Sequence, residues 1–260
     1  MKLASSWAGK LLAEVTVAIV AVALAPRANA SQVKGKFERT LKVTGPASLD
    51  VATGSGNIAV STGDSNNVIV RGTVQVHYEA SGDMEDAQDI LSKIRANPPV
   101  EQHGNSISIG HETGSRYRHV SIDYELIVPR QSEFLARTGS GDLSIAGPLK
   151  SVDLKTGSGD ARIESVLGSV QLTTGSGNVA LKEAGSGGAA VRTGSGDVTV
   201  NLPSEGGLDL SVQTGSGDIS MERGMPIESV STQHHMLIAK VRGGGASFVV
   251  QTGSGDVVIH

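Results

Sequence analysis

The sequence predicts an all-β fold, a parallel β-solenoid (β-helix) with ~18–21-residue coils and one inserted helix. The first observation is that the motif TGSG[DN] recurs along the chain, and the second is that its copies are regularly spaced. From Thr138 onward the spacings are 18, 18, 19, 21 and 38 residues, and the last is two periods. Repetition at a fixed period is typical of stacked repeat architectures. The threonines of the motif are Thr53, Thr138, Thr156, Thr174, Thr193, Thr214 and Thr252.

The third observation is the alternation of apolar and polar residues on both sides of each motif. In the copy at Thr156 the apolar positions hold Leu154, Ala161 and Ile163. The polar Lys155 lies between Leu154 and the motif threonine Thr156. This alternation indicates strands with one buried face. Each unit is therefore a strand, a glycine-rich corner, a second strand and a second turn. Successive coils are expected to stack in parallel, about 4.8 Å apart. An antiparallel sandwich also has short strands and turns, but it gives no reason for one corner to recur.

Two copies of the repeat are irregular. The 38-residue interval predicts a degenerate copy at Thr232, where Gln-His-His-Met replaces Gly-Ser-Gly-Asp. The regular coils are expected over about 131–260, and the coil after Thr252 is expected to be the open C-terminal end of the stack. Unpaired strands can be extended by another chain, so this open C-terminal coil predicts a possible homo-oligomer.

The region between the first two motifs predicts the other elements. Residues 82–97 have apolar residues at helical spacing, a possible N-cap at Ser81 or Asp83, and a Pro-Pro stop at Pro98, so we expect a helix that covers one end or flank of the stack. Residues 67–78, 106–109 and 120–129 are predicted to be strands.

The first thirty residues have the layout of a secretory signal peptide. Lys2 and Lys10 precede an apolar run, and Ala28-Asn29-Ala30 fits a cleavage site. We therefore expect 1–30 to be a signal peptide cleaved near Ala30, and 31–260 to be a single extracytoplasmic domain, either periplasmic or secreted to the cell surface. The chain has no cysteine, so it has no disulfide framework and no cysteine metal site.

Composition and charge exclude several functions. Removing residues 1–30 takes away three positive charges and one negative charge, which changes the net charge from −4 to −6. An acidic chain without a clustered basic face is not expected to bind nucleic acid. Seven equivalent corner serines cannot each have their own base and oxyanion site. A glycan hydrolase would need convergent carboxylates and aromatic platforms, and residues 31–260 contain no Trp. We therefore predict no enzyme activity, no catalytic residues and no cofactor.

The acidic residue that ends each motif has two interpretations. A calcium-stabilised β-roll would use stacked corner carboxylates, with Asp142, Asp160, Asp197 and Asp218 as its calcium-binding residues. One carboxylate per coil is few for an ion that needs six to eight oxygens, and Asp and Asn also suit tight turns. The turn interpretation is therefore favoured, and calcium remains the alternative. The adjacent His234 and His235 would point to opposite faces of a strand, so they are not expected to bind one ion together.

The mature sequence resembles a known family. The runs "FERTLKVTGPASLDVATGSGNIAVSTG" and "YELIVPRQSEFLARTGSGDLSIAG", followed by repeated "V.L.TGSGD", are similar to the bacterial secreted β-strand-repeat family, a domain of unknown function labelled putative adhesin or adhesin-head-like. The resemblance implies a β-solenoid outside the cytoplasm that acts in surface attachment or envelope stress sensing, without established catalytic residues. The predicted function is thus a non-catalytic, adhesin-like or cell-envelope-associated binding or scaffold protein. Its partner would be an unknown envelope or surface component, or another copy of itself.

Overall fold

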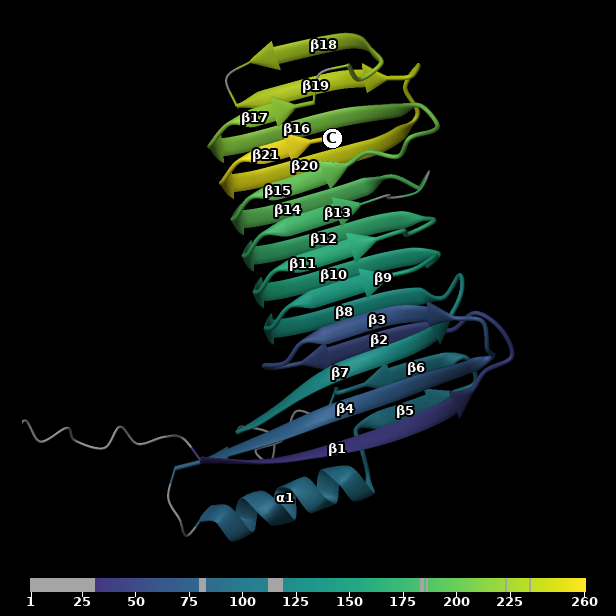
Figure 1. The fold of residues 1–260 in the computed structure, drawn as a ribbon, viewed down its shortest axis with the longest axis vertical. Helices are drawn as coiled ribbons and strands as arrows, with labels where there is room; N and C mark the ends of the chain where they lie inside the picture. Colours follow the sequence, from purple (N-terminus) through teal and green to yellow (C-terminus); the bar gives the residue numbers. More distant parts are fainter. Residues whose placement is uncertain are drawn as a thin grey trace, which may run out of the picture.

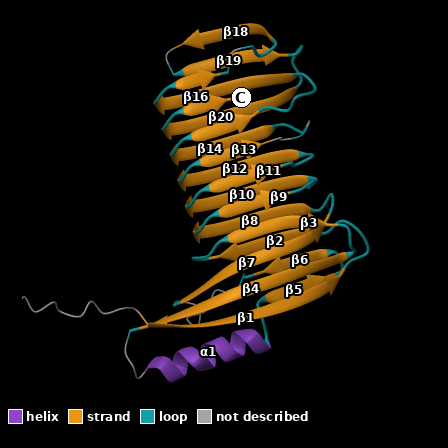
Figure 2. Ribbon diagram, in the orientation of Figure 1, coloured by secondary structure: helices purple, strands orange, loops and turns teal. Residues whose placement is uncertain are grey.

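The computed structural model of the 260-residue chain describes residues 31–79, 83–111, 119–182, 185, 187–222, 224–233 and 235–260. The expected signal peptide lies outside the described residues. The described chain is all-β with one helix, α1 (Met84–Ala96), and its strands form two open, mixed sheets that face each other along a tall stack (Figures 1 and 2). The all-β prediction is therefore confirmed.

We call the two layers sheet A and sheet B. Sheet A contains, in spatial order, β1 (Ser31–Lys42), β4 (Asn67–Tyr78), β7 (Val120–Pro129), β3 (Ile58–Gly63), β9 (Leu143–Ala146), β11 (Ala161–Glu164), β13 (Val179–Lys182), β15 (Val198–Asn201), β21 (Val257–Ile259) and β17 (Ile219–Met221). Sheet B contains, from the same end, β5 (Val100–His103), β6 (Ser106–Ile109), β2 (Ser48–Thr53), β8 (Glu133–Ser140), β10 (Ser151–Ser158), β12 (Ser169–Ser176), β14 (Ala189–Ser195), β20 (Ala246–Ser254), β16 (Leu208–Ser216), β19 (Met236–Val241) and β18 (Ile227–Gln233).

Each TGSG motif joins a strand of sheet B to the following strand of sheet A. Neighbouring units pair in parallel and in register, so that Thr156 of β10 lies opposite Thr174 of β12, and Ile163 of β11 lies opposite Leu181 of β13. The inward residues of both sheets are buried and form one continuous core. The repeat keeps equivalent residues in columns because a spacing of 18 or 19 residues returns the chain to the same place in the next unit.

The unit at Thr252 does not lie at the end of the stack. Strand β20 pairs with β14 on one side and β16 on the other, and β21 likewise lies between β15 and β17. The expected open C-terminal coil is therefore wrong. At the insertion point the large, buried Phe248 lies between the small Ala189 of β14 and Leu210 of β16 in the core column.

The degenerate copy at Thr232 is not a corner between the two sheets. Strands β18 and β19 form an antiparallel hairpin within sheet B, and β19 pairs antiparallel with β16. The prediction of another stacked coil is wrong here because the glycine corner is lost. Instead His235, with φ 60°, belongs to the turn between the two strands, and Met236 starts β19. His234 lies outside the described residues.

The other end of the stack is built differently from the regular units. Strands β1, β4 and β7 pair antiparallel in sheet A, and β5 and β6 pair antiparallel in sheet B. The predicted strands 67–78, 106–109 and 120–129 are β4, β6 and β7. The helix begins after Asp83 and ends before Asn97, which agrees with the predicted range of 82–97, whereas Ser81 lies outside the described residues.

Helix α1 packs on β1 and β4 through three buried residues, Ala87, Leu91 and Ile94. The contact is close at Gly35 of β1, where a Cβ atom would lie 2.9 Å from Leu91 Cδ1. The helix thus covers this end of the stack, as Figure 1 shows.

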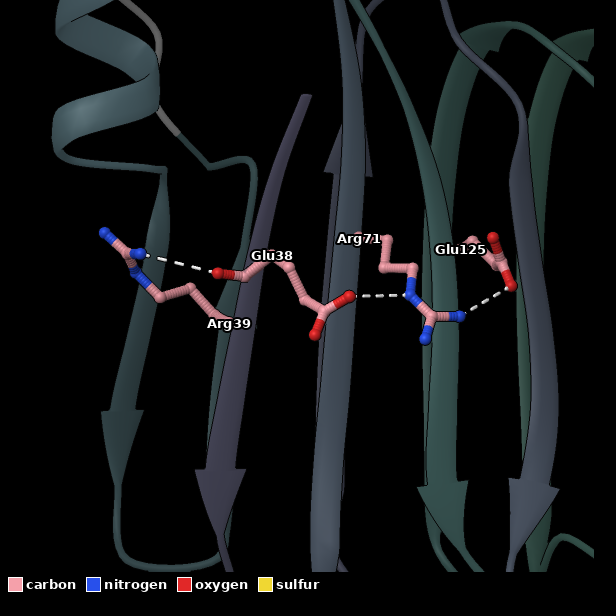
Figure 3. Close-up of polar contacts among 4 residues, drawn as sticks. All are labelled: Glu38, Arg39, Arg71 and Glu125. Atoms are coloured by element: carbon pink, nitrogen blue, oxygen red, sulfur yellow. Dashed lines mark hydrogen bonds and ion pairs between the residues drawn. The ribbon is translucent and has the colours of Figure 1, made fainter. Parts of the chain in front are cut away.

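A network of exposed polar side chains joins the antiparallel strands β1, β4 and β7 of sheet A (Figure 3). Arg71 of β4 donates from Nε to Glu38 Oε2 of β1 at 2.8 Å and from Nη1 to Glu125 Oε1 of β7 at 3.1 Å. Arg39 also donates from Nη1 to the backbone oxygen of Glu38 at 3.4 Å. The hydrogen bond and negative charge of Glu38 raise the pKa of Arg71, and Glu125 adds to the effect. Because these groups are exposed, we assign the network to strand register rather than to a reactive site.

Candidate binding surface

The threonine of each TGSG motif points into the stack and ties two units together. Thr138, Thr214 and Thr252 each donate a hydrogen bond from Oγ1 to the second motif glycine of the neighbouring unit, at 3.0–3.2 Å. Thr174 differs, because its buried Oγ1 has no hydrogen-bond partner within the described structure. The column of motif threonines from Thr138 to Thr252 is therefore part of the core, together with the buried apolar residues of the neighbouring columns.

The Asp or Asn that ends each motif forms a continuous ladder along the outside of the corners. In every step Oδ1 of one residue accepts a hydrogen bond from the backbone N–H of the equivalent residue in the next unit, at 2.8–3.0 Å. A carboxylate that accepts a backbone N–H forms one of the stronger kinds of hydrogen bond. The ladder begins at Asp123 of β7, which is not part of a motif, and continues in spatial order through the motif residues Asn57, Asp142, Asp160, Asn178, Asp197, Asp256 and Asp218.

The glycines of the motif allow the corners to stack. A Cβ atom at Gly159 would lie 2.1 Å from the backbone oxygen of Gly141, and one at Gly157 would lie 2.5 Å from that of Gly139. Gly54 belongs to the first motif, and no atom lies within 4 Å of its hypothetical Cβ. The glycines are thus needed mainly because each corner lies directly against the corner below it.

The structure places the four proposed calcium residues in this one exposed row, but not as neighbours throughout. Asp142 and Asp160 are adjacent, Asn178 separates them from Asp197, and Asp256 lies between Asp197 and Asp218. One oxygen of Asp142, Asp160 and Asp197 already accepts a backbone N–H, whereas Asp218, at the end of the row, takes part through its own N–H, which donates to Asp256. In the described part of the chain, no three His, Cys, Asp or Glu side chains lie close enough to hold a metal ion.

His235 lies over the last corner of the row. Its Nδ1 is 3.0 Å from the backbone oxygen of Gly217, and its own carbonyl accepts a hydrogen bond from the N–H of Thr214. The degenerate copy of the motif therefore covers the corner of the last unit. We assign this histidine a packing role at the end of the corner column.

A groove lies on the opposite edge of the stack, where the chain returns from sheet A to sheet B. It has a volume of about 680 Å³, and its lining combines apolar residues, among them Leu167, which is 52% exposed, with polar side chains. Two of the polar lining residues form an ion pair, in which Lys150 Nζ lies 2.7 Å from Glu133 Oε1. We call this feature the sheet B groove, and it is lined by Pro46, Ala47, Ser48, Asn105, Ser106, Gln131, Glu133, Lys150, Leu167 and Gly168.

A second hollow of about 340 Å³ shares Ser48 and Glu133 with the groove and continues across the outer face of β2, β8, β10 and β12. Its outer-face lining includes Asp153 and Gln171. The two hollows together provide hydroxyl, amide, carboxylate and ammonium groups around an apolar patch. Such a combination suits binding by shape and a few directed hydrogen bonds.

Comparison with known proteins identifies the family. A family model described as Toastrack DUF4097 matches residues 28–260, which is nearly all of the sequence. The chain belongs to the Toastrack DUF4097 family. No curated protein matches this Toastrack chain.

Several solved structures are similar to the Toastrack chain. A putative cell adhesion protein from Clostridium sporogenes is 14% identical, with a TM-score of 0.54 over 87% of this chain and 99% of that one. A putative adhesin from Bacteroides fragilis is 11% identical, with a TM-score of 0.40 over 87% and 97% of the two chains. A putative lipid binding protein from Parabacteroides distasonis is 10% identical, with a TM-score of 0.30 over 86% and 96%. At these identities, the first similarity supports the fold of the Toastrack chain and the other two carry no argument.

The sequence did not predict the groove of this Toastrack chain. Its residues come from second turns that have no common motif, and two of them, Asn105 and Ser106, come from outside the regular repeat. One signal was available, because Leu167 is an apolar residue in a turn that the alternating pattern does not place in the core.

Proposed function

We propose that this Toastrack protein is a non-catalytic, exported β-solenoid that binds a component of the cell envelope or cell surface, in the manner of an adhesin or a scaffold. The parallel, in-register units between β2/β3 and β16/β17 support the solenoid description. The signal-like segment 1–30 supports export. Among the described residues, no helix has the length and apolar content required to cross a membrane.

The observation that carries the proposal is the sheet B groove. The motif residues are used for stacking, since threonine, glycine and Asp or Asn each meet the neighbouring unit. The groove, by contrast, exposes a leucine beside an ion pair and several amides and hydroxyls. An adhesin-like role also agrees with the description of the Clostridium sporogenes protein as a putative cell adhesion protein.

The test is co-sedimentation of residues 31–260 with bacterial peptidoglycan and, separately, with vesicles of bacterial envelope phospholipids. We expect binding to one of them, and we expect the double variant Leu167→Asp, Lys150→Glu to bind at least about tenfold more weakly, because it changes both the exposed leucine and the ion pair of the groove. The matched control is Ser144→Asp, an exposed position on the outer face of sheet A. Binding to neither material, or equal binding by the groove variant, would contradict the proposal.

A further inference from the structure

The two sheets do not end at the same level at either end of the stack. Near the helix, sheet A continues one strand beyond sheet B and ends at β1. Helix α1 covers the inner face of β1 and of its neighbour β4. At the opposite end, sheet A stops at β17, whereas sheet B continues beyond the paired strand β16 with β19 and β18. We call β17, β18 and β19 the stepped end, and it is visible at the top of Figure 1.

Core residues become exposed at the stepped end. Val230 of β18 lies opposite the buried Ala239, so both side chains point to the inner face of sheet B. Val230 is nevertheless 54% exposed, whereas Ala239, Leu210 and Phe248, which lie in register with it along the sheet, are each 1% exposed. The same change occurs in sheet A, where Ile219 and Met221 are half-buried although their neighbours in β21 are fully buried.

The edge strands at this end also lack the charges that usually protect a sheet edge. Strands β17 and β18 each pair on one side only, with β21 and β19, and between them they contain a single charged residue, Glu228. Strand β1, the sheet A edge at the helix end, contains Lys34, Lys36, Glu38, Arg39 and Lys42. Natural proteins place charges on strand edges to prevent pairing with another chain. Sheet A therefore has a charged edge strand, β1, at the helix end and an uncharged edge strand, β17, at the stepped end.

We propose that the stepped end binds the stepped end of a second copy of this chain across a two-fold axis parallel to the strands. Rotation about such an axis exchanges the two layers, so sheet B of the partner continues sheet A of the first copy. In each copy sheet B extends two strands, β19 and β18, beyond the last strand of sheet A at this end. In the dimer these two strands occupy the two levels that are missing from the partner's sheet A. Each copy supplies the same surface, which makes the contact closed and isologous.

Strand direction agrees with this arrangement. Within a unit the chain reverses at the corner, and Figure 1 shows β16 and β17 running in opposite directions. Because β19 is antiparallel to both β16 and β18, β18 runs in the direction of β16 and opposite to β17. Rotation about an axis parallel to the strands keeps these directions. The partner's β18 would therefore pair antiparallel with β17, and Val230 and Ile227 of both copies would enter a shared core with Ile219 and Met221.

This inference goes beyond the proposed function and does not depend on it. The dimer would be a stack of double length with a helix at each outer end and two sheet B grooves. Two grooves on one rigid particle would increase the avidity for a repetitive surface without changing the affinity of either groove.

The experiment is sedimentation equilibrium of residues 31–260, with Val230→Lys compared with Ile238→Lys. Ile238 is the matched control because it is 47% exposed on β19 but lies opposite Ser231 and Ser211, on the outer face of sheet B. We expect the wild type and Ile238→Lys to be dimers, and Val230→Lys to have a dissociation constant at least about tenfold larger, because a lysine would be buried at the contact.

A second variant tests the geometry without weakening the surface. The chain has no cysteine, so Val230→Cys introduces the sole thiol of the protein. In the proposed dimer the two residues lie on facing sheets about 10 Å apart, and a short bis-maleimide should therefore link them. Circular dichroism melts should show that all the variants are folded. A monomeric wild type, an unaffected Val230→Lys dimer, or a dimer in which Val230→Cys cannot be linked would each overturn the proposal.

Discussion

Replacing Gly159 by alanine tests whether the corner glycines are required by contact between units. The backbone at Gly159 does not have the positive φ that would itself exclude alanine, so the effect of the substitution is steric. The new Cβ would lie 2.1 Å from the oxygen and 2.6 Å from the carbon of the Gly141 carbonyl. A close C···O contact in proteins is about 3.3 Å, so the two units must separate by about 1 Å at this corner.

The magnitude follows from what that separation disturbs. Overpacking of a rigid site costs about 1–3 kcal/mol. The corner also holds two hydrogen bonds between these two units, from Leu143 N to Asp160 O and from Asp160 N to Asp142 Oδ1, and weakening them adds about 1 kcal/mol. We therefore expect a loss of about 2–4 kcal/mol in the free energy of unfolding, which for a chain of this size lowers the melting temperature by about 4–16 °C.

The measurement is urea and thermal unfolding of residues 31–260 followed by circular dichroism. Gly54→Ala is the control, because no atom lies within 4 Å of its Cβ position and Gly54 also lacks a positive φ. Its effect should be within about 0.5 kcal/mol. If Gly54→Ala and Gly159→Ala destabilise the protein equally, or if Gly159→Ala is neutral, the contact between stacked corners is not the reason for the glycines.

Two further predictions concern the polar columns of the corner. Thr156 Oγ1 donates to Gly141 O at 3.3 Å, so Thr156→Val should lower the free energy of unfolding by about 1 kcal/mol. Thr174→Val should be neutral or stabilising, because the Thr174 hydroxyl is buried without a hydrogen bond in the described structure. Urea unfolding of both variants checks this, and equal losses of stability would contradict it. Asp160→Asn keeps the Oδ1 that accepts the N–H of Asn178 and should leave the melting temperature nearly unchanged, whereas Asp160→Ala should cost about 1–2 kcal/mol. The same melts with EDTA should have unchanged midpoints, and a drop in EDTA together with a destabilised Asp160→Asn would favour the calcium-stabilised β-roll.

The local fold could be predicted because each rule acts on neighbouring residues. Alternation identified the buried columns, such as Leu154 and Ile163, both with no exposed surface. Helical spacing and the Pro-Pro stop located α1. Both patterns depend on one strand or one helix having a single buried face, which is a property of the segment itself.

The order of the units could not be predicted, since every TGSG unit has nearly the same edge. The unit at Thr193 could pair in register with the unit at Thr214 or with that at Thr252, because all three have the same threonine, serine and glycine positions. In the structure the unit at Thr252 lies between the other two, with Phe248 beside Ala189, and the hairpin that begins at Ile227 pairs with the unit at Thr214. The same interchangeability explains why the stepped end matters: a repeat whose units accept any neighbour must end with an element that is not a repeat. Helix α1 has that role at one end. At the other end β18 and β19 cover sheet B but leave sheet A short, and a second copy would complete it.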